Sequence, residues 1–269
     1  SSDVCSSDLV GEGVRRWRGG ERVISTFVAG WLDGVAPTSS LTLGVPGPGV
    51  LASHVLLDEQ WAAAAPVTLA AAQASTLPCA ALTAWFALVE EGHLHAGQTV
   101  LIHGTGGVAL FGLQFARLHG AQVIMVSGSE DKRARALALG AHHVLARDSD
   151  WPAEVMRLTE GRGAEQVLET VGGANLGRSL QALARNGRVS VIGVLDAGPM
   201  SGSAFDAIGR RATIQGISVG HRAALERMVH AIDLNGLKPV VAAEYGFDEV
   251  PKAFAHLEQG AFGKVVVRM

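Results

Sequence analysis

The sequence predicts an α/β protein built around a doubly wound parallel sheet, with a second, β-rich domain formed from both chain ends. Three observations predict this fold class: short apolar runs alternate with helical patterns from Thr99 onward, a glycine cluster follows the first run, and the flanking regions lack the alternation. Strands joined by crossover helices pair in parallel and are covered by helices on both faces. The central region is therefore expected to be a covered parallel sheet.

The alternation can be followed element by element. The first unit is the apolar run Thr99–His103 and a helical pattern that closes on Gly120, a residue type that commonly ends helices. The remaining expected elements are, in order, a strand at 121–127, a helix at 130–140, a strand at 142–146, a helix at 151–159, a strand at 164–170, a helix at 174–185 and strands at 187–193 and 212–218. This domain is predicted to occupy residues 77–234.

The flanks are expected to pack together as the second domain, made of residues 10–76 and 235–269. The first part has scattered Gly and Pro with short β-rich pieces, and the tail shows a strand, a helix and a final strand at Lys264–Arg268 that needs a sheet to join. The first nine residues, SSDVCSSDL, are Ser-rich and aperiodic. We interpret residues 1–9 as a non-native scar and leave them out of the fold prediction, so Cys5 is given no functional role.

Composition restricts the class of function. The chain has 269 residues, 48% of them hydrophobic, and a net charge of -3 without a long basic run, which argues against nucleic acid or an anionic membrane as partner. Two cysteines make no disulfide framework, and no apolar segment was found of the about 18 residues that a membrane span needs. A secretory signal would need a basic start and an apolar stretch that are absent. These features predict a soluble, cytoplasmic protein with a small-molecule ligand.

The glycine cluster Gly104-Thr105-Gly106-Gly107-Val108-Ala109 follows a strand and opens a helix. Backbone N–H groups and the helix dipole can hold a pyrophosphate at such a position. Gly104 permits the tight turn, Gly106 lets a phosphate approach the backbone, and Ala109 takes the helix-packing position. An ordinary glycine-rich turn would look similar when taken alone. With repeated strand–helix units around it, the cluster predicts a dinucleotide-binding site.

The end of the second strand predicts which dinucleotide is bound. NAD sites place an acidic side chain there to accept hydrogen bonds from the ribose 2′-OH, and this chain has Ser127-Gly128-Ser129 instead. Ser127 and Ser129 can donate hydrogen bonds to a 2′-phosphate, and Lys132 can add positive charge. We therefore expect NADP(H) to be preferred over NAD(H). The alternative for Lys132 is a solvent-exposed residue on a helix without that role.

Four stretches resemble the medium-chain dehydrogenase/reductase superfamily, above all its zinc-type alcohol dehydrogenase-like and quinone oxidoreductase-like members. They are GEGVRRWRGGERVIS, LPCAALTAWFALVEEGHLHAGQTVLIHGTGGVALFGLQFA, ALGAHHVL and FGKVVVRM. The resemblance implies a Rossmann domain, a GroES-like catalytic domain built from both chain ends, hydride transfer with a nicotinamide cofactor, and a homodimer.

The chain also departs from the family pattern. Family members begin well before the segment that matches Val10, so the GroES-like domain is expected to be partial. In zinc-using relatives that earlier portion carries two of the three catalytic metal ligands, and the third matches Cys79. One ligand cannot hold zinc, so we expect no metal site and a structural Cys79. The family's structural zinc lobe with four cysteines is absent.

The resemblance also implies roles at the nicotinamide. Thr83 and Val108 match residues that lie against the two sides of the ring, and Gly193 and Val194 match a loop whose backbone meets the carboxamide; simple packing is the alternative for each. No catalytic residue is identified. The sequence thus predicts an NADPH-preferring, zinc-free oxidoreductase acting on a carbonyl, quinone or enone. A zinc-dependent alcohol dehydrogenase lacking its N-terminal ligands and a non-catalytic nucleotide-binding module are the alternatives.

Overall fold

The computed structural model describes residues 4–6, 9–38, 41–47, 49–196 and 198–269. Contacts divide the chain into two units: Ser1–Leu82 with Val219–Met269, and Thr83–Ser218. We call the first the terminal unit and the second the central unit. The helix α8 (Arg222–Asn235), which the sequence analysis placed in the central domain, groups with the chain ends.

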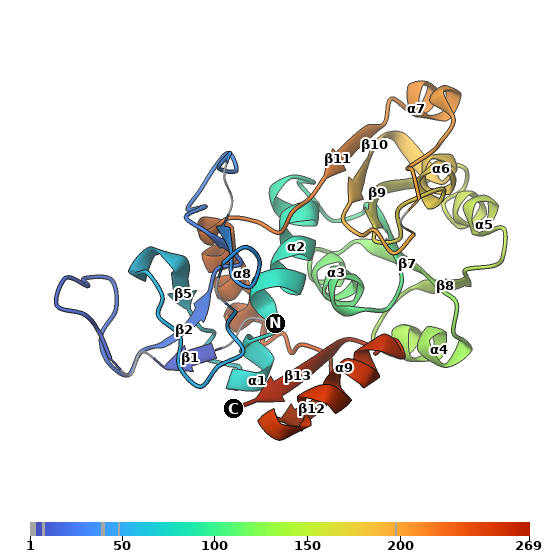
Figure 1. Cartoon of the computed structure of the whole chain (residues 1–269). Coiled ribbons are helices and arrows are strands. Elements are labelled where there is room, and N and C mark those ends of the chain that lie inside the picture. Colours follow the sequence, from blue (N-terminus) through green and yellow to red (C-terminus); the bar gives the residue numbers. More distant parts are fainter. Residues whose placement is uncertain (1–3, 7–8, 39–40, 48, 197) are drawn as a thin grey trace. The chain divides into compact units, whose positions relative to one another are not determined.

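A six-stranded sheet forms the core of the central unit (Figure 1). All of its neighbouring strands are parallel, and their order is β11-β10-β9-β6-β7-β8. The strands are β6 (Thr99–His103), β7 (Gln122–Ser127), β8 (His143–Ala146), β9 (Ala164–Glu169), β10 (Leu183–Val191) and β11 (Thr213–Gly216). This order is that of a doubly wound Rossmann sheet, so the predicted fold class is confirmed.

Helices cover both faces of this sheet. They are α3 (Gly107–Leu118), α4 (Glu130–Ala138), α5 (Trp151–Leu158), α6 (Asn175–Gln181) and α7 (Ala204–Arg210), and α2 (Leu82–Trp85) precedes them at the start of the unit. The helices α3 and α4 pack against β6, β7 and β8, whereas α5, α6 and α7 contact one another and cover the other face (Figure 1). The apolar core beneath the second group includes the fully buried Trp151, Val155 and Leu183.

One predicted helix is shorter than expected. The sequence pattern predicted a helix at 174–185, but α6 ends at Gln181 and β10 already begins at Leu183. Leu183 pairs with Ala164 of β9, and the register of this pair shifts before Arg188. Strand pairing therefore outcompetes local helix propensity at this point, as tertiary contacts commonly do.

The described residues of the terminal unit form short strands and several helices. Its strands form the sheets β1-β2-β5, β3-β4 and β12-β13. They are β1 (Val4–Ser6), β2 (Arg22–Ser25), β3 (Val28–Ala29), β4 (Leu41–Thr42), β5 (Ala62–Ala64), β12 (Val241–Gly246) and β13 (Lys264–Arg268). Besides α8, the helices are α1 (Ala71–Ala74) and α9 (Val250–Glu258), with 3₁₀ turns at Glu59–Trp61 and Phe247–Glu249.

Part of the segment left out of the fold prediction joins a sheet. Val4–Ser6 forms β1 and pairs antiparallel with Arg22–Ile24 of β2. The edge of β2 offers unpaired backbone groups, and extended backbone of almost any sequence can pair with such an edge. Residues 1–3 and 7–8 lie outside the described residues.

A helical stretch over Ala71–Glu90 is long and apolar enough to cross a membrane by length and composition, which the sequence analysis missed. It includes α1, α2 and the π-helical turns Leu77–Ala81 and Phe86–Glu90. However, 72% of its most apolar window is buried inside the structure. Burial in the protein core therefore accounts for its composition.

Candidate functional site

The predicted glycine loop lies where the strand order of the central sheet reverses. The first strand, β6, is flanked by β7 on one side and β9 on the other, so connections leave it in opposite directions. Ligands of open α/β sheets bind outside the carboxyl ends of the strands at such a switch point. Gly104 follows β6 there with a φ of +80°, a left-handed conformation that favours glycine.

The helix that follows this loop begins without a side-chain cap. Gly106 is the N-cap residue of α3, and no side chain accepts a hydrogen bond from the first turn. A Cβ placed on Gly106 would meet nothing within 4 Å, so the approach to the backbone is open. The first N–H groups of a helix need an acceptor, and a phosphate can supply it. The loop therefore fits the pyrophosphate of a dinucleotide.

Thr170 connects this loop to the loop after β10. Its hydroxyl donates a hydrogen bond to the carbonyl of His103 at 2.7 Å, immediately before Gly104. On its other side the backbone packs so closely that a Cβ on Gly193 would lie 1.8 Å from the Thr170 carbonyl oxygen. The loops after β6, β9 and β10 are thus held against one another at the carboxyl edge of the sheet.

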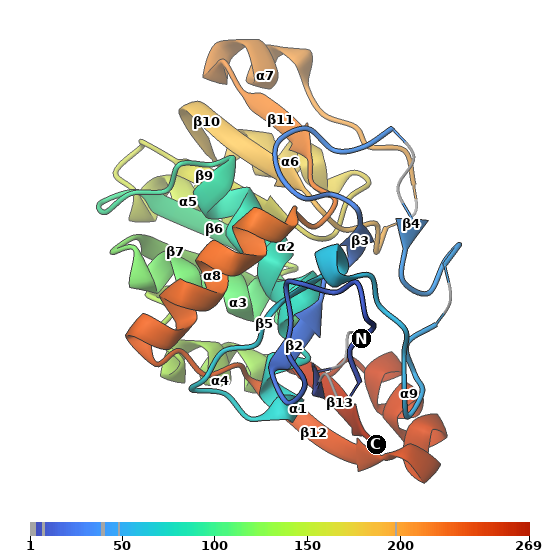
Figure 2. The same cartoon turned by 90° about the vertical axis from the view of Figure 1, so that its left-hand side faces the viewer.

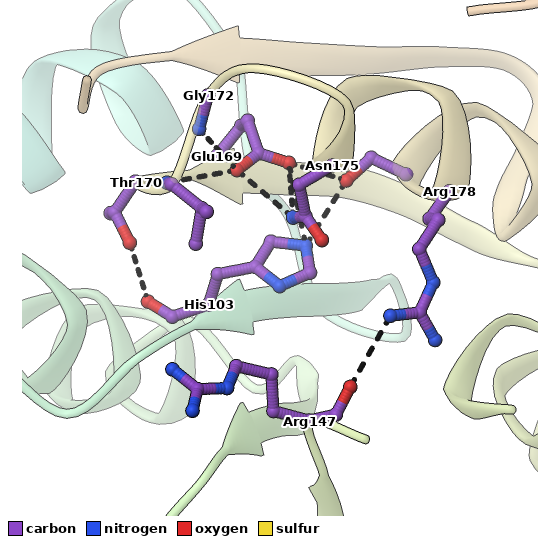
Figure 3. Close-up of polar contacts among 9 residues, drawn as sticks. His103, Arg147, Glu169, Thr170, Gly172, Asn175 and Arg178 are labelled. Carbon is purple, nitrogen blue, oxygen red and sulfur yellow. Dashed lines mark hydrogen bonds and ion pairs between the residues drawn. The ribbon is translucent and has the colours of Figure 1, made fainter. Parts of the chain in front are cut away.

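A buried carboxylate, Glu169, accepts hydrogen bonds from several groups at the same edge (Figure 3). Glu169, at the end of β9, is fully buried and accepts hydrogen bonds from the backbone N–H groups of Val171 (2.9 Å) and Gly172 (3.2 Å). It also accepts from the Asn175 side chain and from the Ser179 hydroxyl at 2.6 Å. These donors use up the capacity of the carboxylate, which suits a structural role rather than proton transfer.

His103 completes this buried network. Its Nε2 lies 3.1 Å from Ser179 Oγ and 3.6 Å from Glu169, and its ring stacks edge-on against Trp151 at 4.9 Å. Because the Ser179 hydroxyl hydrogen is donated to Glu169, Ser179 accepts from His103 Nε2–H. Burial lowers the pKa of His103, an effect that Glu169 opposes and Arg178 reinforces. His103 is therefore a neutral hydrogen-bond donor in this network.

The predicted specificity residues surround the end of β7. Ser127 is the last residue of β7 and is buried, while Ser129 caps α4 by accepting a hydrogen bond from the Lys132 backbone. Two arginines, which the sequence analysis did not single out, join them. Arg133 Nη1 donates to the Ser127 carbonyl at 3.3 Å, and the Arg147 guanidinium packs over Gly128. Two guanidinium groups therefore border the turn between β7 and α4, a helix whose first turn carries Glu130 and Asp131.

The residues predicted to contact a nicotinamide lie on two helices and on the loop after β10. Val108 lies in the first turn of α3, Gly193 and Val194 follow β10, and Val194 is 79% exposed. Thr83 is buried in α2 at the start of the central unit. The glycine loop, the serines and the β10 loop all lie at the carboxyl edge.

Cys79, the predicted match to a zinc ligand, belongs to the terminal unit. Burial raises the pKa of its thiol, and the positive charge of Lys264 counteracts this in part. Burial in turn lowers the pKa of Lys264. Within the described ranges, no group of three His, Cys, Asp or Glu side chains could hold a metal ion. The described residues therefore do not fit a zinc site.

The sequence did not single out three residues of the candidate site, because contacts between distant elements bring them there. Glu169 could have been noticed as an acidic residue that ends an otherwise apolar strand. Arg147 directly follows β8, and β8 neighbours β7, so the predicted strand order could have placed it near Ser127. Arg133, in contrast, has no local signal beyond a helix with many charged residues.

Comparison with known proteins agrees with this geometry. A family model described as zinc-binding dehydrogenase matches residues 107–234. A zinc-type alcohol dehydrogenase-like protein of Schizosaccharomyces pombe is 34% identical over 97% of this chain and 79% of its own length. The chain belongs to the medium-chain dehydrogenase/reductase superfamily. Within this superfamily it is an alcohol dehydrogenase-like oxidoreductase.

Other members of the superfamily are similar in sequence or structure. The quinone oxidoreductase of Pongo abelii is 27% identical over 87% of this chain and 72% of its own length. A candidate alcohol dehydrogenase from Sinorhizobium meliloti 1021 superposes with a TM-score of 0.95 at 55% identity, covering 97% of this chain and 79% of that one. An NAD-dependent alcohol dehydrogenase superposes with a TM-score of 0.88 at 30% identity, covering 97% and 80%.

Proposed function

We propose that this chain is an NADPH-preferring oxidoreductase that transfers hydride to a carbonyl, quinone or enone without zinc. The observation that carries the proposal is the uncapped N-terminus of α3 behind the glycine turn at the switch point. Membership of an oxidoreductase superfamily supports a nicotinamide cofactor, and one similar structure is of an NAD-dependent enzyme. The absence of an acidic side chain at the end of β7 distinguishes this chain from the usual NAD site.

The residues of the glycine loop would hold the pyrophosphate through their backbone. The loop comprises Gly104, Thr105, Gly106, Gly107 and Val108. A nicotinamide bound next to it would supply the hydride. Thr83 and Val108 would pack against the ring, while the backbone at Gly193 and Val194 would bind its carboxamide. These contacts would orient the ring toward the substrate, which is the main catalytic contribution a protein makes to hydride transfer.

The first test of this function is turnover. Purified protein should oxidise NADPH in the presence of simple quinones, enones or aldehydes, followed by the loss of absorbance of the reduced nicotinamide. The non-catalytic alternative predicts saturable NADPH binding without oxidation for any of these acceptor classes. Absence of both binding and turnover would refute the proposed function altogether.

The second test concerns metal. Among the residues that the structure describes, no group of three possible metal ligands is present, at Cys79 or elsewhere. Elemental analysis of purified protein should therefore find no stoichiometric zinc. About one zinc per chain that disappears in a Cys79→Ser variant would instead favour the zinc-dependent alcohol dehydrogenase alternative.

We also propose that the protein is a cytoplasmic homodimer paired through β11. This strand lies at the edge of the central sheet, beside β10 (Figure 2). Its Ile214 side chain is 44% exposed. On α7, Phe205 is 90% and Ile208 is 75% exposed. Two copies of an edge strand can pair about a two-fold axis and cover such apolar side chains. Sedimentation should show a dimer, and Phe205→Glu with Ile208→Glu should shift it to monomer.

A further inference from the structure

Arg147 reaches from β8 across to the end of the neighbouring strand. A Cβ built on Gly128 would lie 3.0 Å from Nη2 and 3.1 Å from Cζ of Arg147, so the guanidinium lies directly over this glycine. Its charged group is therefore placed between Ser127 and Ser129. Any larger residue at position 128 would have to displace it.

A second guanidinium approaches the same segment. Arg133, in the first turns of α4, donates to the Ser127 carbonyl at 3.3 Å. Within the part of the chain that the structure describes, neither Arg133 nor Arg147 forms an ion pair with a carboxylate. Two cations that converge on one segment without a paired carboxylate favour binding of an anion between them.

The backbone that carries Arg147 is held in place by α6. Arg178 donates a hydrogen bond to the Arg147 carbonyl at 3.2 Å (Figure 3). It donates another to the Ser149 carbonyl at 2.6 Å. Its guanidinium also stacks over the ring of the fully buried Trp151 at 4.6 Å. Arg178 thus holds the loop after β8 through three contacts, two with backbone carbonyls and one with the Trp151 ring.

The same helix is tied to the network beneath the glycine loop. Asn175 and Ser179, on either side of Arg178 in α6, both donate to Glu169. The helix α6 therefore contacts both Glu169, at the end of β9, and the loop that carries Arg147. This arrangement couples the position of Arg147 to that of the glycine loop.

We infer that Arg147 is the principal residue that selects a 2′-phosphorylated dinucleotide, and that Arg178 is a positioning residue that acts through it. This inference rests on the proposed function and assigns its specificity to residues beyond Ser127, Ser129 and Lys132. A guanidinium binds phosphate with two parallel, charge-assisted hydrogen bonds, which a hydroxyl cannot do. The ribose 2′-OH of NADH offers no such charge.

The test is to titrate NADPH and NADH into the wild-type protein and the Arg147→Ala variant, with binding followed by fluorescence. Loss of charge-assisted hydrogen bonds should weaken NADPH binding by about tenfold or more. NADH binding should change by less than about twofold. A second experiment compares 2′,5′-ADP, 5′-AMP and inorganic phosphate as competitors of NADPH. It shows whether the site recognises the 2′-phosphate of a nucleotide. If inorganic phosphate competes as well as 2′,5′-ADP, the site is a general anion site and the inference is overturned.

Arg185→Ala is the matched control, because Arg185 is also an exposed arginine of the central sheet but lies near the amino end of β10. It should leave both affinities unchanged. Equal losses for NADPH and NADH in Arg147→Ala, or no loss, would overturn the inference while leaving the proposed function intact. If wild-type protein binds neither nucleotide, the proposed function itself fails.

A double-mutant cycle tests the role of Arg178. Arg178→Lys keeps the charge but loses the two-pronged contact with the carbonyls of residues 147 and 149. It should lower the ratio of NADPH to NADH affinity, which a purely structural defect would leave constant because both affinities would fall together. In the Arg147→Ala background the same change should have no further effect on that ratio. An additional loss of selectivity there would show that Arg178 does not act through Arg147.

Discussion

The entries into α3 and α4 are two strand-to-helix turns at the same edge of one sheet, and they differ in how the helix begins. At α3 the N-cap is Gly106, and no side chain satisfies the first turn. At α4 the hydroxyl of Ser129 caps the helix, and guanidinium groups border the turn. The first turn leaves backbone donors for a ligand, whereas the second offers charged side chains.

The two turns therefore offer separate places to set affinity for a dinucleotide and selectivity between NADPH and NADH. Every dinucleotide carries a pyrophosphate, so the α3 turn should act on NADPH and NADH alike. Only NADPH carries a 2′-phosphate, so the α4 turn should act on the ratio of the two affinities. Glu169 supports both turns, the first through Thr170 and the second through α6. The variants below separate these three contributions.

The largest effect is expected from Glu169→Ala, which removes the acceptor common to both turns. Buried N–H and hydroxyl donors would lose their partner, and the free energy of unfolding should fall by about 3 kcal/mol or more. Urea denaturation measures this. Glu154→Ala, which removes only an exposed ion pair with Arg157, should cost less than about 0.5 kcal/mol. Similar losses in both variants would contradict the structural role of Glu169.

Gly106→Val should abolish the function of the α3 turn alone. A side chain at this position meets no protein atom within 4 Å, so the free energy of unfolding should change by less than about 1 kcal/mol. The same side chain would obstruct the approach of a phosphate, and both NADPH and NADH should bind about 100-fold more weakly. Loss of only one of the two affinities would show that the turn does not hold the shared pyrophosphate.

Ser127→Asp should affect the α4 turn alone. The carboxylate would repel a 2′-phosphate and pair with the arginines around it, so NADPH affinity should drop by about tenfold or more. NADH affinity should stay the same or rise, because an acidic group here can accept from the 2′-OH. Titration of both nucleotides checks this, and unchanged NADPH affinity would count against the 2′-phosphate site.

The smallest effect is a pH dependence from His103. Burial lowers its pKa in the folded state, while the unfolded state keeps a value of about 6.5. The unfolded chain thus binds more protons below about pH 6.5, so stability is full above that pH and is lost as the pH falls toward the folded pKa. Between pH 7.5 and 5.5 the loss should be about 1 kcal/mol.

His103→Gln supplies the control for that measurement. Its amide can still donate to Ser179 but does not titrate, so the decline in unfolding free energy between these two pH values should become smaller. Burial also lowers the pKa of His142, which therefore leaves a residual slope in the variant. An identical slope in wild type and variant would show that His103 is not held neutral.

The strand, the glycine turn and the helix start at α3 were predictable from the sequence, whereas the surroundings of the α4 turn were predictable only in part. Glycine spacing between a strand and a helix is a local signal, because such a turn depends on backbone conformation. One cation at the α4 turn comes from another element: Arg147 directly follows β8, and its backbone carbonyl accepts a hydrogen bond from Arg178 of α6. Such contacts depend on which strands are neighbours in the sheet. The sequence pattern indicates that strands and helices alternate, but it does not show the order of the strands in the sheet.

The central unit and the terminal unit also differ in how far their elements could be predicted from the sequence. The central unit has strands of four to nine residues that alternate with helices, so the succession of its elements along the chain was predictable. In the terminal unit, β3 and β4 have two residues each, too few for any periodicity to show. Residues 4–6 pair with β2 through their backbone, and that pairing has no signature in side-chain pattern.

The ratio of NADPH to NADH affinity in the wild-type protein tests the central claim most directly. If the α3 turn binds the pyrophosphate and the α4 turn binds the 2′-phosphate, NADPH should bind at least about tenfold more tightly than NADH. For the same reason, 2′,5′-ADP should compete more strongly than 5′-AMP. Equal affinities, or a preference for NADH, would contradict the assignment of the α4 turn to the 2′-phosphate.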